Sequence, residues 1–190
     1  KRVRVKRNIV NYGKGRALKK AFRHVSGEYV VFLDADLDLH PGQVQTLFDI
    51  MKLDDVDIVI GSKLHPNSSV EYPQSRRFIS LLYYFFIKLL FGLPVRDTQT
   101  GLKLLKAKVL REVFPRLVVK KFAFDLELLA NAHRLGYRIA EAPIVLEQKR
   151  KYGRIGGEAI WQAGWDTLAV FYRMYILKYY DQVKENPKDE

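Results

Sequence analysis

A continuous apolar run followed at once by clustered carboxylates is the feature that most constrains how this chain can fold. Residues 29–33 are all aromatic or aliphatic, and Asp34, Asp36 and Asp38 come directly after them. An apolar run without polar alternation favours a central parallel strand that is covered on both faces. In open α/β sheets, ligands bind beyond the carboxyl ends of such strands. The sequence therefore predicts a ligand site at these aspartates.

Helical and strand patterns alternate along the rest of the chain. Helical spacing of apolar residues covers residues 14–24, 44–51, 76–92, 109–114 and 124–135, and strand patterns cover residues 57–61 and 138–146. This alternation predicts an α/β fold with an open, mostly parallel sheet flanked by helices. Residues 65–73 are rich in Pro, Ser and Asn, which predicts an irregular or mobile loop that could act as a lid. Residues 2–5 predict an edge strand with nothing before it, so we expect an N-terminal portion of the domain to be missing.

Three neighbouring aspartates repel one another unless a cation neutralises them. Such clusters usually bind a divalent cation such as Mg²⁺ or Mn²⁺, which neutralises their charge. The competing interpretation is a solvated acidic turn that caps the next helix. An EF-hand would need Gly and Glu where the sequence has Leu39 and Gln45. A phosphatase-type aspartyl nucleophile would need Thr or Val at Asp38. The DxD motif of nucleotide-sugar transferases fits Asp34 and Asp36 without exceptions, and its metal bridges the diphosphate of the donor.

Charge balance and the lack of cysteine narrow the partners and the chemistry. The 190 residues contain 33 Lys and Arg against 21 Asp and Glu, which gives a formal net charge of +12. This excess indicates an anionic partner: nucleic acid, an anionic membrane surface or a phosphorylated substrate. Because cysteine is absent, disulfides, thiolate zinc sites and cysteine nucleophiles are excluded.

Two apolar stretches, residues 78–93 and 168–180, were compared with the requirements of a membrane span. A spanning helix needs about 20 apolar residues, and these stretches are shorter and interrupted by Lys88, Arg173 and Lys178. Helical spacing gathers an aromatic stripe near the C-terminus, made of Trp161, Trp165, Leu168, Tyr172, Tyr175 and Tyr179. This stripe predicts either a terminal helix packed on the core or an interfacial helix lying on lipid.

A series of short motifs resembles family 2 glycosyltransferases, in the branch of the dolichyl-phosphate mannose and glucose synthases. The matching motifs keep the order of the family over residues 3–153; they are residues 11–18, 27–37, 61–63, 76–77, 97–103, 124–127 and 141–144. The resemblance implies a GT-A-type fold that lacks the first strand and helix, which read the nucleotide base. Residues 150–153 also match the family, but Ile155 and Gly156 replace its usual Ser-Lys pair.

The resemblance implies roles for particular acidic and basic side chains. Asp34, Asp36 and Asp38 would hold Mg²⁺ or Mn²⁺, and Asp36 would belong to the catalytic centre. Lys14, which stands between two glycines before a helix, would contact the donor phosphates together with Asp34 and Asp36. Asp97 would also belong to the catalytic centre, where it would shape the sugar pocket; the alternative is that it caps the turn that follows it.

Further charged residues were assigned to the acceptor and the phosphates. Guanidinium groups bind phosphate bidentately, so basic side chains are the candidates. They are Arg76, Arg77, Arg96, Lys149 and Arg150. Arg76 and Arg77 would belong to the catalytic centre, and Arg96 and Arg150 would bind the donor phosphates. In relatives with hydroxyl acceptors, an acid near Asp125 or Glu127 acts as general base. These two cannot share a helix face, and a phosphate acceptor is already anionic at neutral pH and needs no base.

Together these features predict a metal-dependent, inverting transfer of a hexose to a polyprenyl or dolichyl phosphate. The donor would be GDP-mannose or UDP-glucose, and residues 97–99 lean towards the glucose branch. We expect a peripheral protein on the cytoplasmic face of a membrane, with a transferase domain at 1–153, an amphipathic aromatic helix at 154–181 and a charged tail at 182–190. Because the base-reading strand is missing, we expect little or no transfer by this chain alone.

The alternative is a noncatalytic basic module, either an inactive remnant or a nucleic-acid binder. Nucleic-acid readers usually carry a helix-turn-helix, an aromatic RRM sheet or a zinc framework, and none of these motifs is evident in the sequence. Net charge alone supports this alternative, so the sequence predicts no nucleic-acid partner.

Overall fold

The fold is built around a four-stranded sheet in which one strand runs against the others. The computed structural model describes residues 3, 5–10, 13–36, 38–70, 74–119, 123–146 and 157–182. The strands lie in the order β1 (Tyr29–Phe32), β4 (Lys103–Lys106), β2 (Ile58–Ser62) and β5 (Ile139–Pro143). β4 is antiparallel to both of its neighbours, whereas β2 and β5 are parallel. β1, β2 and β5 therefore end at the same edge of a mixed sheet.

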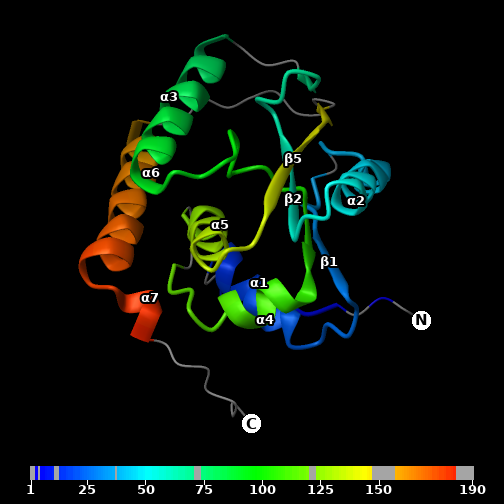
Figure 1. The fold of residues 1–190 in the computed structure, drawn as a ribbon, viewed down its shortest axis with the longest axis horizontal. Coiled ribbons are helices and arrows are strands. Elements are labelled where there is room, and N and C mark those ends of the chain that lie inside the picture. Colours follow the sequence, from blue (N-terminus) through cyan, green and yellow to red (C-terminus); the bar gives the residue numbers. More distant parts are fainter. Residues whose placement is uncertain are drawn as a thin grey trace.

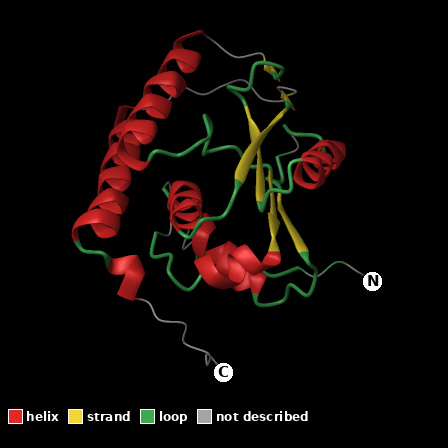
Figure 2. Cartoon of the chain, in the orientation of Figure 1, coloured by secondary structure: helices red, strands yellow, loops and turns green. Residues whose placement is uncertain are grey.

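Helices cover both faces of this sheet and add an outer layer on one side. They are α1 (Lys14–Phe22), α2 (Val44–Leu53) after the short helix η1 (Pro41–Gln43), α3 (Gln74–Phe91), α4 (Ala107–Val113), α5 (Phe124–Arg134), α6 (Gly157–Phe171), the π-helical segment η2 (Tyr172–Ile176) and α7 (Tyr179–Gln182). Figure 1 shows α2 on one side of the sheet and α5, α4 and α1 on the other. Beyond α5, α3 and α6 form the outer layer, and Figure 2 shows how far these two helices stand from the strands.

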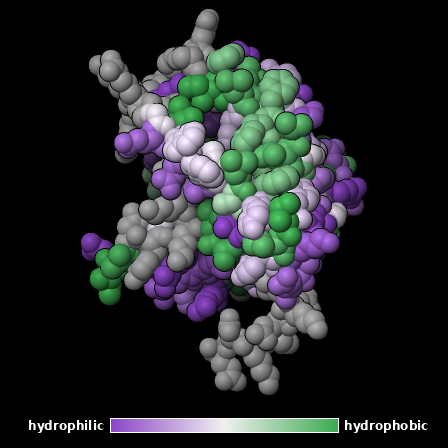
Figure 3. Space-filling view, turned by 90° about the vertical axis from the view of Figure 1, so that its left-hand side faces the viewer, coloured by the Kyte–Doolittle hydropathy of each residue, from purple (hydrophilic) through white to green (hydrophobic). Residues whose placement is uncertain are grey.

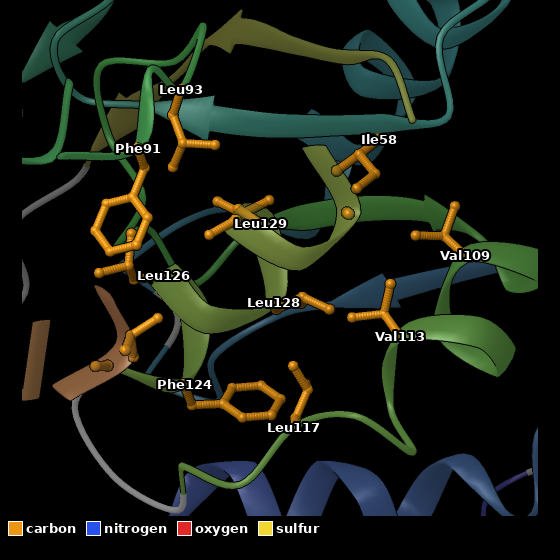
Figure 4. Close-up of a cluster of buried hydrophobic side chains, with 14 of the residues drawn as sticks. Ile58, Phe91, Leu93, Val109, Val113, Leu117, Phe124, Leu126, Leu128 and Leu129 are labelled. Atoms are coloured by element: carbon orange, nitrogen blue, oxygen red, sulfur yellow. The ribbon is translucent and has the colours of Figure 1, made fainter. Parts of the chain in front are cut away.

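Two apolar cores lie on opposite faces of the sheet because side chains alternate along each strand. In β2, Ile58 and Ile60 join the core shared with α3, α4 and α5, whereas Val59 joins the core under α2. Figure 4 shows side chains of α5 at the centre of the larger core, with those of β2 and α4 around them. α5 is buried over nine consecutive residues from Phe124, so it is a central element of the fold.

Among the strands that the structure describes, the first apolar run lies at the edge of the sheet, whereas the sequence predicts a central strand. β1 stands at the end of the strand order, and the side chain of Val31 is 39% exposed, whereas β2 is buried over its whole length. An apolar run can specify a strand, but the position of that strand depends on which distant segments pair with it. β4 takes the inner place next to β1 and makes the sheet mixed.

Two smaller expectations near the surface are also corrected. Val3 and Val5, the described residues of the expected edge strand at 2–5, are exposed and not in a strand, since alternation forms a strand only where another strand pairs with it. Within residues 65–70, the expected irregular loop contains β3 (Ser69–Val70), which pairs in parallel with β6 (Val145–Leu146). The Ser68 hydroxyl donates a hydrogen bond to the Ser62 carbonyl, which ties this segment to the end of β2. Residues 71–73 of that loop lie outside the described part of the chain.

The aromatic stripe near the C-terminus faces outward, while the opposite side of the same helices packs on the core. Thr167, Val170 and Met174 are buried, and the Tyr83 hydroxyl lies 3.1 Å from that of Thr167, which joins α3 to α6. All six residues of the stripe are exposed. Among the described helices, none is both long enough and apolar enough to cross a membrane.

Candidate functional site

The aspartates of the DxD motif lie just beyond the end of β1, at the edge where β2 and β5 also end. The side chain of Asp34 is 47% exposed, and Asp36 is exposed. The backbone N–H of Asp38 donates to Asp36 Oδ1 at 3.3 Å, which bends the chain into a turn. Asp38 Oδ1 is buried without a hydrogen-bond partner. The two motif carboxylates therefore face solvent at the edge predicted for a ligand.

Gly101 packs directly against the Asp34 carboxylate. A Cβ atom added to Gly101 would lie 2.0 Å from Asp34 Oδ2 and 2.3 Å from its Cγ, so any side chain here would occupy the place of the carboxylate. Gly101 ends the polar segment that begins near Asp97. Two motifs that are far apart in the sequence thus meet at Asp34.

Lys14 contacts the other oxygen of Asp34 and links it to a buried ion pair. Lys14 Nζ lies 3.3 Å from Asp34 Oδ1 and 3.3 Å from Asp125 Oδ2. Lys103, whose side chain is fully buried, lies 2.8 Å from Asp125 Oδ1 and also donates to the Thr100 carbonyl. Burial acts against the charge of Lys14, but the carboxylates of Asp125 and Asp34 outweigh it and raise the pKa of Lys14 above its usual value.

Asp97 organises the loop that leads to Gly101. Its Oδ2 accepts hydrogen bonds from the Thr100 hydroxyl at 2.6 Å and from the Lys63 backbone at 3.1 Å, and its Oδ1 accepts one from the Gln99 backbone at 3.0 Å. The backbone N–H of Asp97 donates in turn to Glu141 Oε1. The Asp97 carboxylate is therefore engaged within the protein, which supports the turn-capping interpretation of this residue. Its role in shaping a sugar pocket stays a prediction.

Asp125 and Glu127 have different surroundings, in line with the prediction that they do not share a face of the helix. Asp125 contacts Lys14 and Lys103, whereas Glu127 is fully buried and accepts hydrogen bonds from the backbone of Val118 and Val119 and from the Tyr180 hydroxyl. Because Asp125 is held by two ammonium groups, it belongs to the framework of the site.

The predicted phosphate-binding arginines lie in different places. Arg76 and Arg77 belong to the first turn of α3, where Arg76 is half-buried and Arg77 exposed. Arg96 is exposed, and its backbone N–H donates to Glu141 Oε1 at 2.6 Å. Lys149 and Arg150 lie outside the described residues. The assignment of these side chains to phosphate groups stays a prediction.

The carboxylates at this edge of the sheet supply part of the ligand set that a divalent cation needs. In the described part of the chain, no three His, Asp or Glu side chains are gathered into a cation site, so Asp34, Asp36 and Asp38 do not form a complete cage. Two exposed carboxylates on one turn are nevertheless suitable oxygen ligands if the diphosphate of a donor completes the coordination. Asp34 and Asp36 therefore fit a metal that is shared with a ligand.

Sequence analysis missed three features of this site. The contact of Gly101 with Asp34 and the burial of Lys103 both depend on the pairing of β4 beside β1. Glu141 accepts hydrogen bonds from the backbone N–H groups of Arg96 and Asp97, which lie 45 and 44 residues before it in the sequence. One signal was available for Lys103, because a lysine next to the apolar pair Leu104 and Leu105 in a strand needs an acidic partner if it is buried.

The fold is that of GT-A nucleotide-sugar transferases. A crystal structure of glucosyl-3-phosphoglycerate synthase from Mycobacterium tuberculosis with Mn²⁺, UDP-glucose and phosphoglyceric acid matches with a TM-score of 0.64 and 19% identity, over 85% of this chain and 56% of that one. A second structure of that enzyme, with Mg²⁺ and UDP, matches with a TM-score of 0.61 and 18% identity, over 93% of this chain and 57% of that one.

Sequence comparisons identify the family. The pattern described as Glycosyl transferase family 2 matches residues 1–114. Dolichyl-phosphate beta-glucosyltransferases of Trichomonas vaginalis and Dictyostelium discoideum are each 34% identical to this chain, over 71% and 70% of its length and 43% of theirs. The chain therefore belongs to glycosyltransferase family 2, and it spans less than half the length of these relatives.

Proposed function

We propose that this chain supplies the donor-phosphate half of a hexosyltransferase that moves glucose from UDP-glucose to dolichyl or another polyprenyl phosphate. The observation that carries the proposal is the convergence on Asp34 of Lys14 and Gly101, from two other family motifs. Relatives named dolichyl-phosphate beta-glucosyltransferases support both the glucosyl group and the lipid phosphate acceptor. They favour UDP-glucose over GDP-mannose, the other donor considered from the sequence.

The chemistry expected at the site is displacement at the anomeric carbon. An oxygen of the acceptor phosphate forms the new bond to that carbon, the bond to the donor diphosphate breaks, and UDP leaves from the opposite face with inversion. A divalent cation, Mg²⁺ or Mn²⁺, when bound by Asp34 and Asp36 and the diphosphate, neutralises charge on the leaving group. Lys14 is placed to bind a phosphate oxygen nearby. The acceptor phosphate is anionic at neutral pH, which agrees with an Asp125 that is already paired with two lysines.

A lipid acceptor requires a membrane surface near the site, and the outer helices α3 and α6 support this part of the proposal. Phe78, Leu82, Phe85 and Leu89 of α3 are 54–84% exposed, and Trp161 and Trp165 of α6 are 70% and 57% exposed. Figure 3 shows apolar side chains gathered on this face of the molecule. Large exposed apolar areas on soluble domains mark contact with proteins or membranes. We propose that the protein is peripheral on the cytoplasmic face of a membrane.

Nucleic-acid binding is less well supported than the enzymatic function. The lysines at the carboxyl edge of the sheet are engaged within the protein: Lys14 with Asp34, Lys63 with Asp97 and Lys103 with Asp125. Their charge therefore balances buried or site carboxylates rather than forming a continuous stripe for a nucleic-acid backbone.

A transfer assay with labelled donors tests the proposed function. The protein is incubated with Mn²⁺, dolichyl phosphate in detergent and either UDP-glucose or GDP-mannose labelled in the sugar, and the lipid fraction is counted. UDP binding is measured in parallel by calorimetry with and without Mn²⁺. We expect Mn²⁺-dependent UDP binding that is lost in Asp36→Asn, and any labelled lipid to come from UDP-glucose. Asp49→Asn, an exposed carboxylate of α2, is the control and should behave like wild type.

Two results would contradict the proposal in different ways. UDP binding that is insensitive to Mn²⁺ and equal in wild type and Asp36→Asn would remove the donor-site assignment. If labelled lipid formed from GDP-mannose and not from UDP-glucose, the chain would still be a hexosyltransferase, but its donor would be GDP-mannose and the transferred sugar mannose.

A further inference from the structure

Four charged side chains, Lys103, Asp125, Lys14 and Asp34, form a continuous chain of ion pairs, and the transfer chemistry does not explain why they are linked. Two carboxylates and two ammonium groups alternate along it, with separations of 2.8 Å, 3.3 Å and 3.3 Å between the charged atoms. Its inner end is fully buried at Lys103, and its outer end is half-exposed at Asp34. The chain therefore connects the core of the protein with one of the proposed metal ligands.

The two glycines that flank Lys14 place it beside α5. Gly13 before it has φ 91°, and Gly15 after it packs against α5: a Cβ atom at Gly15 would lie 2.4 Å from the Phe124 ring. Phe124 is the neighbour of Asp125 in α5. The contact of Gly15 with Phe124 thus sets how far Lys14 stands from Asp125.

Asp125 is fixed as well, because its second oxygen is paired with Lys103. Lys103 lies in β4, is completely buried, and also donates to the Thr100 carbonyl. A buried ammonium without its carboxylate partner is costly, so Asp125 stays with Lys103 whatever happens at the surface. Of the two ammonium groups in the chain, that of Lys14 is the exposed one, at 36% against 0% for Lys103, and it lies between Asp34 and Asp125.

We propose that Lys14 is the resident counter-ion of Asp34, which a divalent cation must displace, and that Asp125 retains the displaced ammonium group beside the donor phosphates. Oxygen ligands bind such cations at about 2.0–2.6 Å. A cation on Asp34 Oδ1 would lie close to the Lys14 ammonium group, which now contacts that same oxygen, and the like charges would repel. Turning towards the phosphates while remaining paired with Asp125 relieves the repulsion. This inference rests on the proposed function and assigns positioning roles to Lys14 and Asp125.

Mn²⁺ binding followed by electron paramagnetic resonance separates this role from simple phosphate binding. Without nucleotide, Lys14→Gln removes the competing cation, so we expect Mn²⁺ to bind about two- to fivefold more tightly, the range for a partly exposed ion pair. With UDP present, the same variant lacks a phosphate contact and should bind Mn²⁺ and UDP more weakly than wild type. Lys14→Arg should restore the wild-type affinity for Mn²⁺ alone. Lys20→Gln, an exposed lysine of α1 that contacts Asn8, should change neither measurement.

Asp125→Asn should act in the opposite direction. Lys14 then has Asp34 as its remaining carboxylate in the chain, so Mn²⁺ alone should bind more weakly than to wild type. Because this variant also weakens the pairing of Lys103, its folding is checked by thermal unfolding, and the Lys14 variants decide the question if it does not fold.

The possible outcomes distinguish this inference from the proposed function. Unchanged or weaker binding of Mn²⁺ alone to Lys14→Gln would overturn the counter-ion role, even if Asp36→Asn abolishes Mn²⁺-dependent UDP binding. Equal Mn²⁺-dependent UDP binding by wild type and Asp36→Asn would instead overturn the proposed donor site, whatever the Lys14 variants show.

Discussion

At the residue scale, Asp34 illustrates how contacts from both sides orient one carboxylate. Gly101 touches its Oδ2 side and Lys14 its Oδ1 side. The backbone of Gly101 lies outside the left-handed region, so alanine is compatible with the local conformation. The space taken by Asp34 is the reason that this position excludes a side chain.

Gly101→Ala should therefore displace the Asp34 carboxylate without unfolding the protein. We expect the Mn²⁺-dependent affinity for UDP to fall by about tenfold or more, since an interaction with a charged group contributes about 1.5–3 kcal/mol. Calorimetric titration of UDP measures the effect. Gly164→Ala in α6, where an added Cβ would meet nothing within 4 Å, is the matched control. Equal affinities of the two variants would show that the position of Asp34 does not matter for donor binding.

At the element scale, the buried Glu127 joins α5 to α7. Burial raises the pKa of Glu127, although the hydrogen bonds from Tyr180 and from the backbone of Val118 and Val119 oppose that effect. Burial raises the pKa of Tyr180, and the charge and hydrogen bond of the Glu127 carboxylate raise it further. The unfolded chain loses the Glu127 proton near pH 4.5, and the folded protein loses it at a higher pH. This group therefore lowers stability as pH rises above about 4.5 and through its folded pKa.

Tyr180→Phe should destabilise the fold more at neutral than at acidic pH. The variant removes the Tyr180 hydroxyl that donates to Glu127 at 2.5 Å, and hydrogen bonds to charged groups contribute about 1.5–3 kcal/mol. That loss is largest when Glu127 is ionised, so urea unfolding should show a greater difference from wild type at pH 8 than at pH 4. Tyr179→Phe, at a neighbouring tyrosine that is 37% exposed, should have little effect at either pH. A pH-independent loss would mean that Glu127 stays protonated in the folded state over this range.

At the scale of the whole molecule, many of the large exposed apolar side chains belong to the outer helices α3 and α6. The face of α3 and α6 carries exposed aromatic and aliphatic side chains (Figure 3). The helix α2 lies on the far side of the sheet (Figure 1). The net charge of +12 adds a general attraction to anionic lipid. Basic groups near such a surface contribute about 1 kcal/mol each. Apolar contact and charge should thus act together.

Binding to anionic phospholipid vesicles should depend on this face. Phe85 is 62% exposed and Trp165 57% exposed, and a large apolar side chain contributes about 1.5–3 kcal/mol when fully buried. We expect Phe85→Ser/Trp165→Ser to reduce vesicle binding by about tenfold or more, and salt to weaken binding of the wild type. Sedimentation with vesicles measures both effects. Leu53→Ser, at an 83% exposed leucine of α2, is the control. Equal binding by this control and the double variant, or no binding by wild type, would remove the membrane surface from the proposal.

Most helices and strands, and the place of the DxD motif, could be predicted from the sequence because they depend on local patterns. Helical spacing predicted α1, α3 and α5 to within a few residues, and the apolar run before Asp34 predicted the strand that presents it. The ordered motifs indicated the family, which the comparisons confirmed.

The contacts between distant segments could not be predicted from the sequence and became known from the fold. β4 pairs antiparallel between β1 and β2, an arrangement that no pattern within residues 29–33 specifies. The same pairing buries Lys103 next to Asp125, and Gly101 meets Asp34 across 67 positions of the sequence. Pairing and burial depend on the free energy of the whole fold, whereas spacing and composition act within a few residues. For this reason the sequence predicted the carboxylates of the site, and the tertiary structure supplied the contacts that orient them.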